Sequence, residues 1–253
     1  MSISIDIPTG GPLFEGHFPG RPILPGVAEL AMVIRALRPA AGPKALRAIP
    51  FLRFRGIVVP KDTLVLEARL AVDGAVRFEL RRGGDRVADG AMHFGKPDDR
   101  TELGVTGEWR PPQGLPRLDE LLPHRPPMRF VERVVDETEE GITCLARIPG
   151  DCALVDQGTA LAAVALEAAA QTAAVRESLR HWREATSSQP RICYLVSVRD
   201  AVLYRETIPA DVDLYAAIRL VTRSGPLCTY ASEVMTEEAM ALRGLIGTYL
   251  SDE

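Results

Sequence analysis

The sequence predicts an α+β protein made of two similar modules, each a helix followed by a run of antiparallel strands. In the first half, a helical pattern that begins at residue 26 precedes several strand-like runs. In the second half, a longer alanine-rich pattern over residues 159–182 precedes four more. Residues 53–64 and 202–214 share one plan, which is a strand, a proline turn with an aspartate, and a second strand. An internal repeat of this size indicates two related modules in one chain.

Composition sets limits on the class of protein. Of the 253 residues 46% are hydrophobic and 25% charged, close to the average for globular proteins, and this length fits one large domain or two small ones. The net charge of −4 argues against a nucleic-acid binder. We find no apolar run of the roughly 20 residues that a membrane span needs, and no signal-peptide pattern. The four cysteines form no CxxC pair, so we interpret them as reduced and the protein as cytoplasmic.

The first module is expected over residues 1–97. A short strand over residues 3–7 leads into a glycine-rich loop and a helix that Pro39 ends at about Leu37. Strand-like runs follow, with tight turns at Asp73-Gly74 and at residues 83–85. These runs cover residues 46–59, 63–72, 75–81 and 87–94.

Residues 98–114 are polar and rich in proline and glycine, and they are expected to be a linker. Trp109 in this segment is expected to pack on a domain surface. The second module is then expected over residues 115–253, with its long helix from about Thr159 to Trp182. Its predicted strands cover residues 129–135, 142–148, 192–204, 213–221, 227–235 and 241–249.

The stretch Phe14–Leu30 carries the most specific pattern in the chain. It holds a histidine, three glycines and three prolines, followed by apolar residues at helical spacing. The pattern predicts a stiff loop that ends at a helix N-terminus, where free backbone N–H groups can hold a carbonyl or an oxyanion. His17 lies just before that terminus. A base, a rigid loop and backbone donors are the components of an acyl-processing site.

Residues 16–27, G-H-F-P-G-R-P-I-L-P-G-V, resemble the signature of the β-hydroxyacyl-ACP dehydratases, which have the hotdog fold. The resemblance implies that His17 is the base, that the Gly26 N–H binds the thioester carbonyl, and that Phe18 and Pro25 contact the substrate. In that family an acid follows the histidine by fourteen residues, and here that position is Ala31. Glu29 lies two positions earlier, which is about 200° away around a helix.

The second half carries the missing acid. The segment L-E-A-A-A-Q, residues 166–171, resembles the central helix of the same dehydratases, so Glu167 matches the catalytic glutamate and Gln171 is expected to orient it. Fourteen residues before Glu167 lies Ala153, so this half lacks the base. Because each site of the family is shared between two subunits, the resemblance implies a double hotdog with one composite site. The opposite site, with Ala31 and Ala153, is expected to be inactive.

These residue types suit the elimination of water from a 3-hydroxyacyl thioester. A neutral imidazole can remove the C2 proton, and a hydroxyl leaves more readily when a carboxyl protonates it. Burial is expected to raise the pKa of Glu167 and so favour that second role. We therefore predict a 3-hydroxyacyl-[acyl-carrier-protein] dehydratase that forms a trans-2-enoyl thioester in fatty-acid or aryl-polyene biosynthesis. The two halves are similar to the two dehydratase subunits of aryl-polyene clusters, here fused.

The remaining expectations concern neighbours and partners. His124 is expected to anchor a loop rather than to react. The protein is expected to use no metal or other cofactor and to act on substrates carried by acyl carrier protein. Four arginines are expected to be solvated or to contact that carrier: Arg53, Arg55, Arg81 and Arg82. An acyl thioesterase and a non-catalytic acyl-binding subunit stay open as alternatives. Acyl chain length and further assembly of the pseudo-dimer also stay open.

Overall fold

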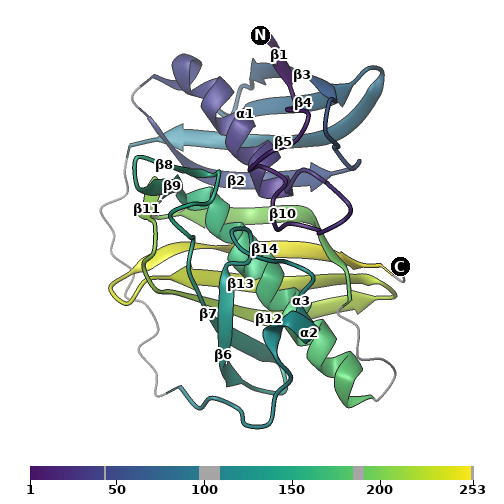
Figure 1. Ribbon diagram of the computed structural model, residues 1–253. Coiled ribbons are helices and arrows are strands. Elements are labelled where there is room, and N and C mark those ends of the chain that lie inside the picture. The colour runs from purple at the N-terminus through teal and green to yellow at the C-terminus, as the bar shows by residue number, and fades with distance from the viewer. Residues whose placement is uncertain (43, 97–108, 185–190, 252–253) are drawn as a thin grey trace.

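The computed structural model describes residues 1–42, 44–96, 109–184 and 191–251 (Figure 1). In these residues eleven strands form one antiparallel sheet, in the order β1-β3-β4-β5-β2-β10-β14-β13-β12-β7-β6. Figure 1 shows the two long helices, α1 and α3, in front of this sheet, one against each half. The α+β class and the division into two helix-and-sheet modules are therefore confirmed.

The first module is close to the sequence prediction. Its helix α1 spans Gly26–Ala41 and runs past the expected end, with Pro39 inside its last turns. A proline so close to the end removes only one hydrogen bond of the helix, so the helix continues beyond it. The strands are β1 (Ser2–Asp6), β2 (Ala45–Phe54), β3 (Thr63–Leu70), β4 (Val76–Arg82) and β5 (Asp85–Gly95).

The second module differs from the prediction at the start of its helix. The expected helix from about Thr159 is wrong there, because α3 spans only Leu166–Arg183 and the 3-10 turn η1 (Ala162–Ala165) precedes it. The other elements are α2 (Leu118–Leu121), β6 (Val131–Glu137), β7 (Gly141–Ala146), β8 (Val155–Asp156), β9 (Thr159–Leu161), β10 (Cys193–Leu203), β11 (Thr207–Pro209), β12 (Leu214–Ser224), β13 (Leu227–Met235) and β14 (Met240–Leu250). Strands β8, β9 and β11 form a small second sheet that the sequence did not predict.

The two modules join through the antiparallel pair β2 and β10. Arg53 pairs with Ser197, and Val202 pairs with Ala48. In the internal repeat Arg53 corresponds to Val202, so these two pairings are related by a two-fold axis. The sheet therefore continues across the joint with the symmetry of a dimer, although both halves belong to one chain.

Small side chains bring α3 close to the sheet. Ala168, Ala169 and Ala173 are fully buried, and α3 contacts strands β7, β10, β12, β13 and β14. Alanine favours the helix and leaves room for neighbouring backbone. Helix α1 contacts the turn η1, so the apolar cores of the two modules meet at the start of α3.

The predicted linker, residues 98–114, lies mostly outside the described residues. Trp109, in its described part, stacks on Tyr215 of β12 with ring centroids 5.5 Å apart, as expected for a packing role. In the part of the chain that the structure describes, no helix combines the length and the hydropathy needed to cross a membrane.

Candidate active site

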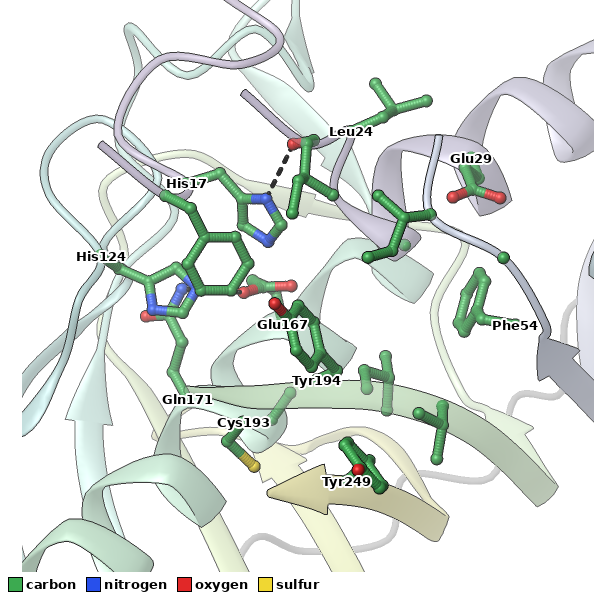
Figure 2. Close-up of a pocket in the computed structure, with 18 of the residues that line it drawn as sticks. His17, Leu24, Glu29, Phe54, His124, Glu167, Gln171, Cys193, Tyr194 and Tyr249 are labelled. Carbon is green, nitrogen blue, oxygen red and sulfur yellow. Dashed lines mark hydrogen bonds and ion pairs between the residues drawn. The ribbon is translucent and has the colours of Figure 1, made fainter. Parts of the chain in front are cut away.

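A pocket of about 320 Å³ lies between the two halves (Figure 2). Residues of the first half line one part of it, and the rest is lined by residues at the start of α3, in β10, at the end of β14 and in the loop after α2. The lining comprises His17, Phe18, Ile23, Leu24, Gly26, Glu29, Phe54, Arg55, Gly56 and Ile57 from the first half, and His124, Glu167, Ala170, Gln171, Cys193, Tyr194, Leu195, Val196 and Tyr249 from the second.

Two loops from opposite halves position the histidines. The backbone N–H of Arg125 donates to the Gly16 carbonyl at 2.7 Å. Gly16 has φ +77°, and a Cβ there would lie 2.1 Å from the Arg125 carbonyl oxygen. Only glycine allows both this backbone angle and this close approach. The contact brings His17 of one loop beside His124 of the other, with ring centroids 5.3 Å apart.

His17 has the properties of a base. Its Nδ1 lies 2.9 Å from the Ile23 carbonyl oxygen, which can only accept, so Nδ1 carries the proton and Nε2 holds a free lone pair. Burial lowers the pKa of His17 to about 4, although the nearby Glu167 carboxylate opposes this shift. The imidazole is therefore neutral at pH 7.

The N-terminus of α1 provides a backbone donor at the position where the sequence predicts a carbonyl-binding group. Gly26 is the first residue of α1, and among the described residues its backbone N–H has no acceptor. A Cβ at Gly26 would lie 3.0 Å from the Phe54 ring, so glycine lets β2 and the helix approach closely at the pocket wall. Phe18 also lines the pocket, whereas Pro25, predicted to contact substrate, caps α1 and does not line it.

Glu167 and Gln171 enter the pocket from the start of α3, one turn apart. The Gln171 amide N–H₂ donates to Glu167 Oε1 at 3.0 Å and to the Met128 carbonyl at 2.7 Å. Its oxygen accepts from the Phe130 N–H at 2.8 Å. Every polar atom of the Gln171 side chain is therefore bonded, and Gln171 fixes the orientation of Glu167 as expected.

His124 lies in this site, a position that the expectation of a loop-anchoring role did not include. The side chain is 3% exposed, and its Nε2 lies 3.4 Å from Glu167 Oε1. Its Nδ1 is buried and has no partner among the described residues. No local pattern indicates this position, because His124 is distant from both His17 and Glu167 along the chain.

The expectation for the pKa of Glu167 is wrong. Burial raises this pKa, but the hydrogen bond and charge of His124, the charge of His17 and the Gln171 hydrogen bond outweigh it. The pKa of Glu167 therefore lies below its usual value, and the group is a carboxylate at neutral pH. The histidine that sequence reasoning missed is the main cause of this reversal.

His17, His124 and Glu167 form one buried cluster, with ligand-type atoms all within 4.8 Å of one another. Two imidazoles and a carboxylate are a donor set that a zinc ion accepts. The same atoms form a base and an adjacent histidine–carboxylate pair for proton transfer. Figure 2 shows the three side chains facing one another on one side of the pocket.

The arginines that the sequence analysis singled out differ in their relation to the pocket. Arg55 lines the pocket and pairs with Asp89, and Arg82 donates to Asp62 and to the Ile57 carbonyl, both at 2.9 Å. Arg81 pairs with Glu79. The three arginine side chains are partly exposed, and a neighbouring carboxylate balances the charge of each.

Comparison with known proteins agrees with this geometry. A family model described as ApeP dehydratase matches residues 116–253, which is more than half of the chain. The chain belongs to the ApeP-like dehydratase family. A second model, described as ApeI dehydratase, matches residues 1–91. The His17 half and the Glu167 half thus match two different dehydratase families, which confirms a fusion of two related modules.

Among curated relatives, the 3-hydroxyacyl-[acyl-carrier-protein] dehydratase FabZ of Thermus thermophilus is 37% identical over 94 residues, covering 34% of this chain. FabZ of Enterococcus faecalis is 34% identical over 99 residues, covering 32% of this chain and 67% of the relative. The chain spans 61% of the length of the Thermus relative.

Solved structures share the whole fold. The dehydratase domain of RzxB from Pseudomonas fluorescens aligns with 98% of this chain and 93% of its own, at 13% identity and a TM-score of 0.72. A trans-AT PKS dehydratase domain from Brevibacillus brevis covers 99% and 94%, at 12% identity and TM-score 0.75. The dehydratase heterocomplex ApeI:P from Xenorhabdus doucetiae covers 55% of this chain and 94% of its own, at 17% identity and TM-score 0.51. At these identities the likeness establishes the fold, a double hotdog.

Proposed function

We propose that this protein is a 3-hydroxyacyl-[acyl-carrier-protein] dehydratase that acts through one composite site. The observation that supports this most is the meeting of His17 and Glu167, from opposite halves, in a single buried pocket beside the N-terminus of α1. The family membership and the FabZ relatives support the same reaction class.

Each residue has a stated task in this proposal. The thioester carbonyl binds the Gly26 N–H, where the partial positive charge of the helix terminus stabilises developing enolate character. His17 Nε2 removes the proton from C2. The C2–C3 double bond forms as the C3–O bond breaks, and the departing hydroxyl takes a proton and leaves as water.

The proton for the hydroxyl comes from the pair formed by Glu167 and His124. Glu167 is a carboxylate at rest, so the pair acts as the donor in the form that has taken up one added proton, shared between Glu167 Oε1 and His124 Nε2 across their 3.4 Å contact. After the reaction His17 carries the proton from C2, and the pair has lost one. Proton exchange with solvent restores both, so the protein needs no metal or other cofactor for this scheme.

The proposal includes a carrier-bound substrate of the fatty-acid or aryl-polyene type and a cytoplasmic location. The pocket is largely apolar, as an acyl chain requires, and opens where Ile57 and Tyr249 are each 41% exposed. All four cysteines are free and buried, as expected in a reducing compartment.

The test is incubation with a panel of 3-hydroxyacyl carriers, alkyl and aryl, followed by mass spectrometry of the carrier. Loss of 18 Da from at least one member is expected. A thioesterase would instead release the free carrier, and a binding subunit would leave every substrate intact.

The composite nature of the site has its own test. Residues 1–97 and 115–253 produced as separate chains should each be inactive, and co-expression should restore dehydration. A His17→Ala first half should not be rescued by an intact second half. Full activity of either half alone would contradict a site shared between them.

A further inference from the structure

Glu29 is a buried acid that the proposed chemistry does not use. It lies in the first turn of α1, is 4% exposed, and lines the pocket. Its Oε2 atom is buried and has no hydrogen-bond partner among the described residues. A buried polar atom without a partner is costly, and proteins usually avoid it unless a ligand completes the bond.

Burial favours the protonated form of Glu29. Burial raises its pKa well above the usual value, and the charge of Arg82 offsets this only in part. The Arg82 guanidinium instead bonds to the Ile57 carbonyl and to Asp62, each at 2.9 Å. A protonated carboxyl both donates and accepts a hydrogen bond, so Glu29 suits a neutral polar group such as an amide.

Glu29 lies on the side of the pocket that leads to its mouth. Figure 2 shows Glu29 and Phe54 on the side opposite His124 and Gln171. The chain that follows Phe54 reaches the surface, where Ile57 is 41% exposed, whereas Gln171 is 1% exposed. When the reacting carbons of a thioester reach the buried histidines, its sulfur lies nearer the mouth. The arm on the other side of the sulfur therefore passes Glu29.

The spacing along α1 fits one group in particular. Gly26 and Glu29 are three residues apart, so they lie on the same face of the helix, about one turn from each other. In a thioester of a cysteamine-type arm, two carbons separate the sulfur from an amide. If the thioester carbonyl binds the Gly26 N–H, the distance from that carbonyl to the amide is comparable to the helical pitch of about 5.4 Å.

We propose that the buried carboxyl of Glu29 binds the amide next to the sulfur in the carrier arm, and so selects amide-bearing thioesters. This inference rests on the proposed dehydratase function. It gives Glu29 a role in recognising the arm, and it leaves the acid–base steps to the His17 cluster.

The test compares two 3-hydroxybutyryl thioesters that differ only in the arm. One is the N-acetylcysteamine thioester, and the other is the S-pentyl thioester, in which methylene groups replace the amide. Wild type should favour the first in kcat/KM. Glu29→Leu should reduce this preference by about 10-fold, the value of a hydrogen bond whose loss leaves a polar group unpaired. Glu29→Gln should retain the preference, because its amide also donates and accepts.

Controls separate this role from a general effect on the pocket. Val196→Ala alters another lining residue and should leave the ratio of the two substrates unchanged. Glu29→Met is a second apolar variant of similar length, to be used if Glu29→Leu does not fold, as judged by thermal melting.

An unchanged ratio in the apolar variants would overturn the proposal. A change in preference between acyl chains with and without a terminal hydroxyl, with the arm ratio unaffected, would also overturn it, because Glu29 would then contact the acyl chain. Absence of dehydration of both thioesters and of carrier-bound substrates by wild type would refute the proposed function itself, which is a distinguishable result.

Discussion

The pocket at His17 and Glu167 has a counterpart related to it by the internal two-fold, and the two differ greatly in volume. The first is a cavity of about 320 Å³, whereas the second, between Ile34, Leu46 and Leu203, is about 10 Å³. In the repeat, Leu46 corresponds to Leu195 and Leu203 to Phe54 of the open pocket. The same framework therefore produces one open site and one closed site.

Three local differences account for the closure. Ile34 lies where the open pocket has Ala170, so a larger side chain fills the space. The N–H of Ala162, which corresponds to Gly26, donates to the Glu206 carbonyl at 2.9 Å and is not free for a ligand. The Glu206 side chain also pairs with Arg38 across the position that corresponds to the mouth.

The proposed catalytic side chains and the empty volume occur together in one of the two sites. An unfilled apolar cavity destabilises a fold, by about 24 cal/mol per Å³ in one measured series. The molecule has such a volume at the site with the base and the acid, and it is filled at the counterpart, where the corresponding positions are Ala31 and Ala153.

The largest effect is expected from His17→Ala and Glu167→Gln, each of which should lower kcat by about 10²–10⁴-fold because each removes an acid–base group. Ala153→Ser, at the histidine position of the closed counterpart, is the matched control and should leave the rate unchanged. Turnover of a 3-hydroxyacyl carrier measures all three. Comparable damage from Ala153→Ser would mean that the closed counterpart also reacts.

A smaller loss is expected from His124→Gln. This variant removes the group that holds Glu167 ionised and shares its added proton, so kcat should fall by about 10–100-fold, consistent with a hydrogen bond to a charged group. KM should change little, because His124 acts through Glu167. His93→Gln, outside the pocket, is the control. A His124→Gln enzyme with full kcat would show that Glu167 works without its neighbour.

The pH profile tests whether the base in the open pocket is desolvated. Protonated His17 cannot act as a base, and burial lowers its pKa to about 4. The acidic limb of kcat/KM should therefore lie near pH 4 rather than at the ordinary histidine value of about 6.5. Glu167 raises the pKa of His17, so removing its charge should move the limb lower still in any residual activity. An acidic limb between pH 6 and 7 would contradict a desolvated base.

The smallest change is expected when the closed counterpart is given catalytic residues. A mechanism-based alkynyl thioester should label one histidine per chain in wild type, and it should still label one in the Ala31→Glu, Ala153→His double variant. The reason is that about 10 Å³ admits no acyl chain. Intact-mass measurement counts the labels, and His17→Ala should abolish labelling. Two labels per chain would show that the counterpart opens.

The sequence predicts the parts of this site that depend on local pattern. His17 and Gly26 lie in a loop whose glycines and prolines determine its shape, and Glu167 lies in a helix whose alanines favour its formation. The sequence also predicts that the two halves share one site, because the first half has the base without the acid and the second half has the acid without the base.

What the sequence did not predict depends on contacts between distant segments. His124 reaches the site only because its loop bonds to Gly16, and the pKa of Glu167 depends on that histidine. Residues 159–161 form a strand because β11 pairs with them, which overrides the helical tendency of the alanine-rich segment. The continuation of α1 past Pro39 likewise reflects the rest of the helix rather than the proline itself.

The two-fold register between β2 and β10 has a consequence for assembly. A register of this symmetry is one that two copies of the first module could also adopt through their own β2 strands. Such a pair would hold two bases and no acid, and would be useless for elimination. Covalent linkage places the correct partner at a millimolar effective concentration, which dilute free copies of the module do not reach. A single chain therefore ensures that every assembled molecule contains one complete set of reactive groups.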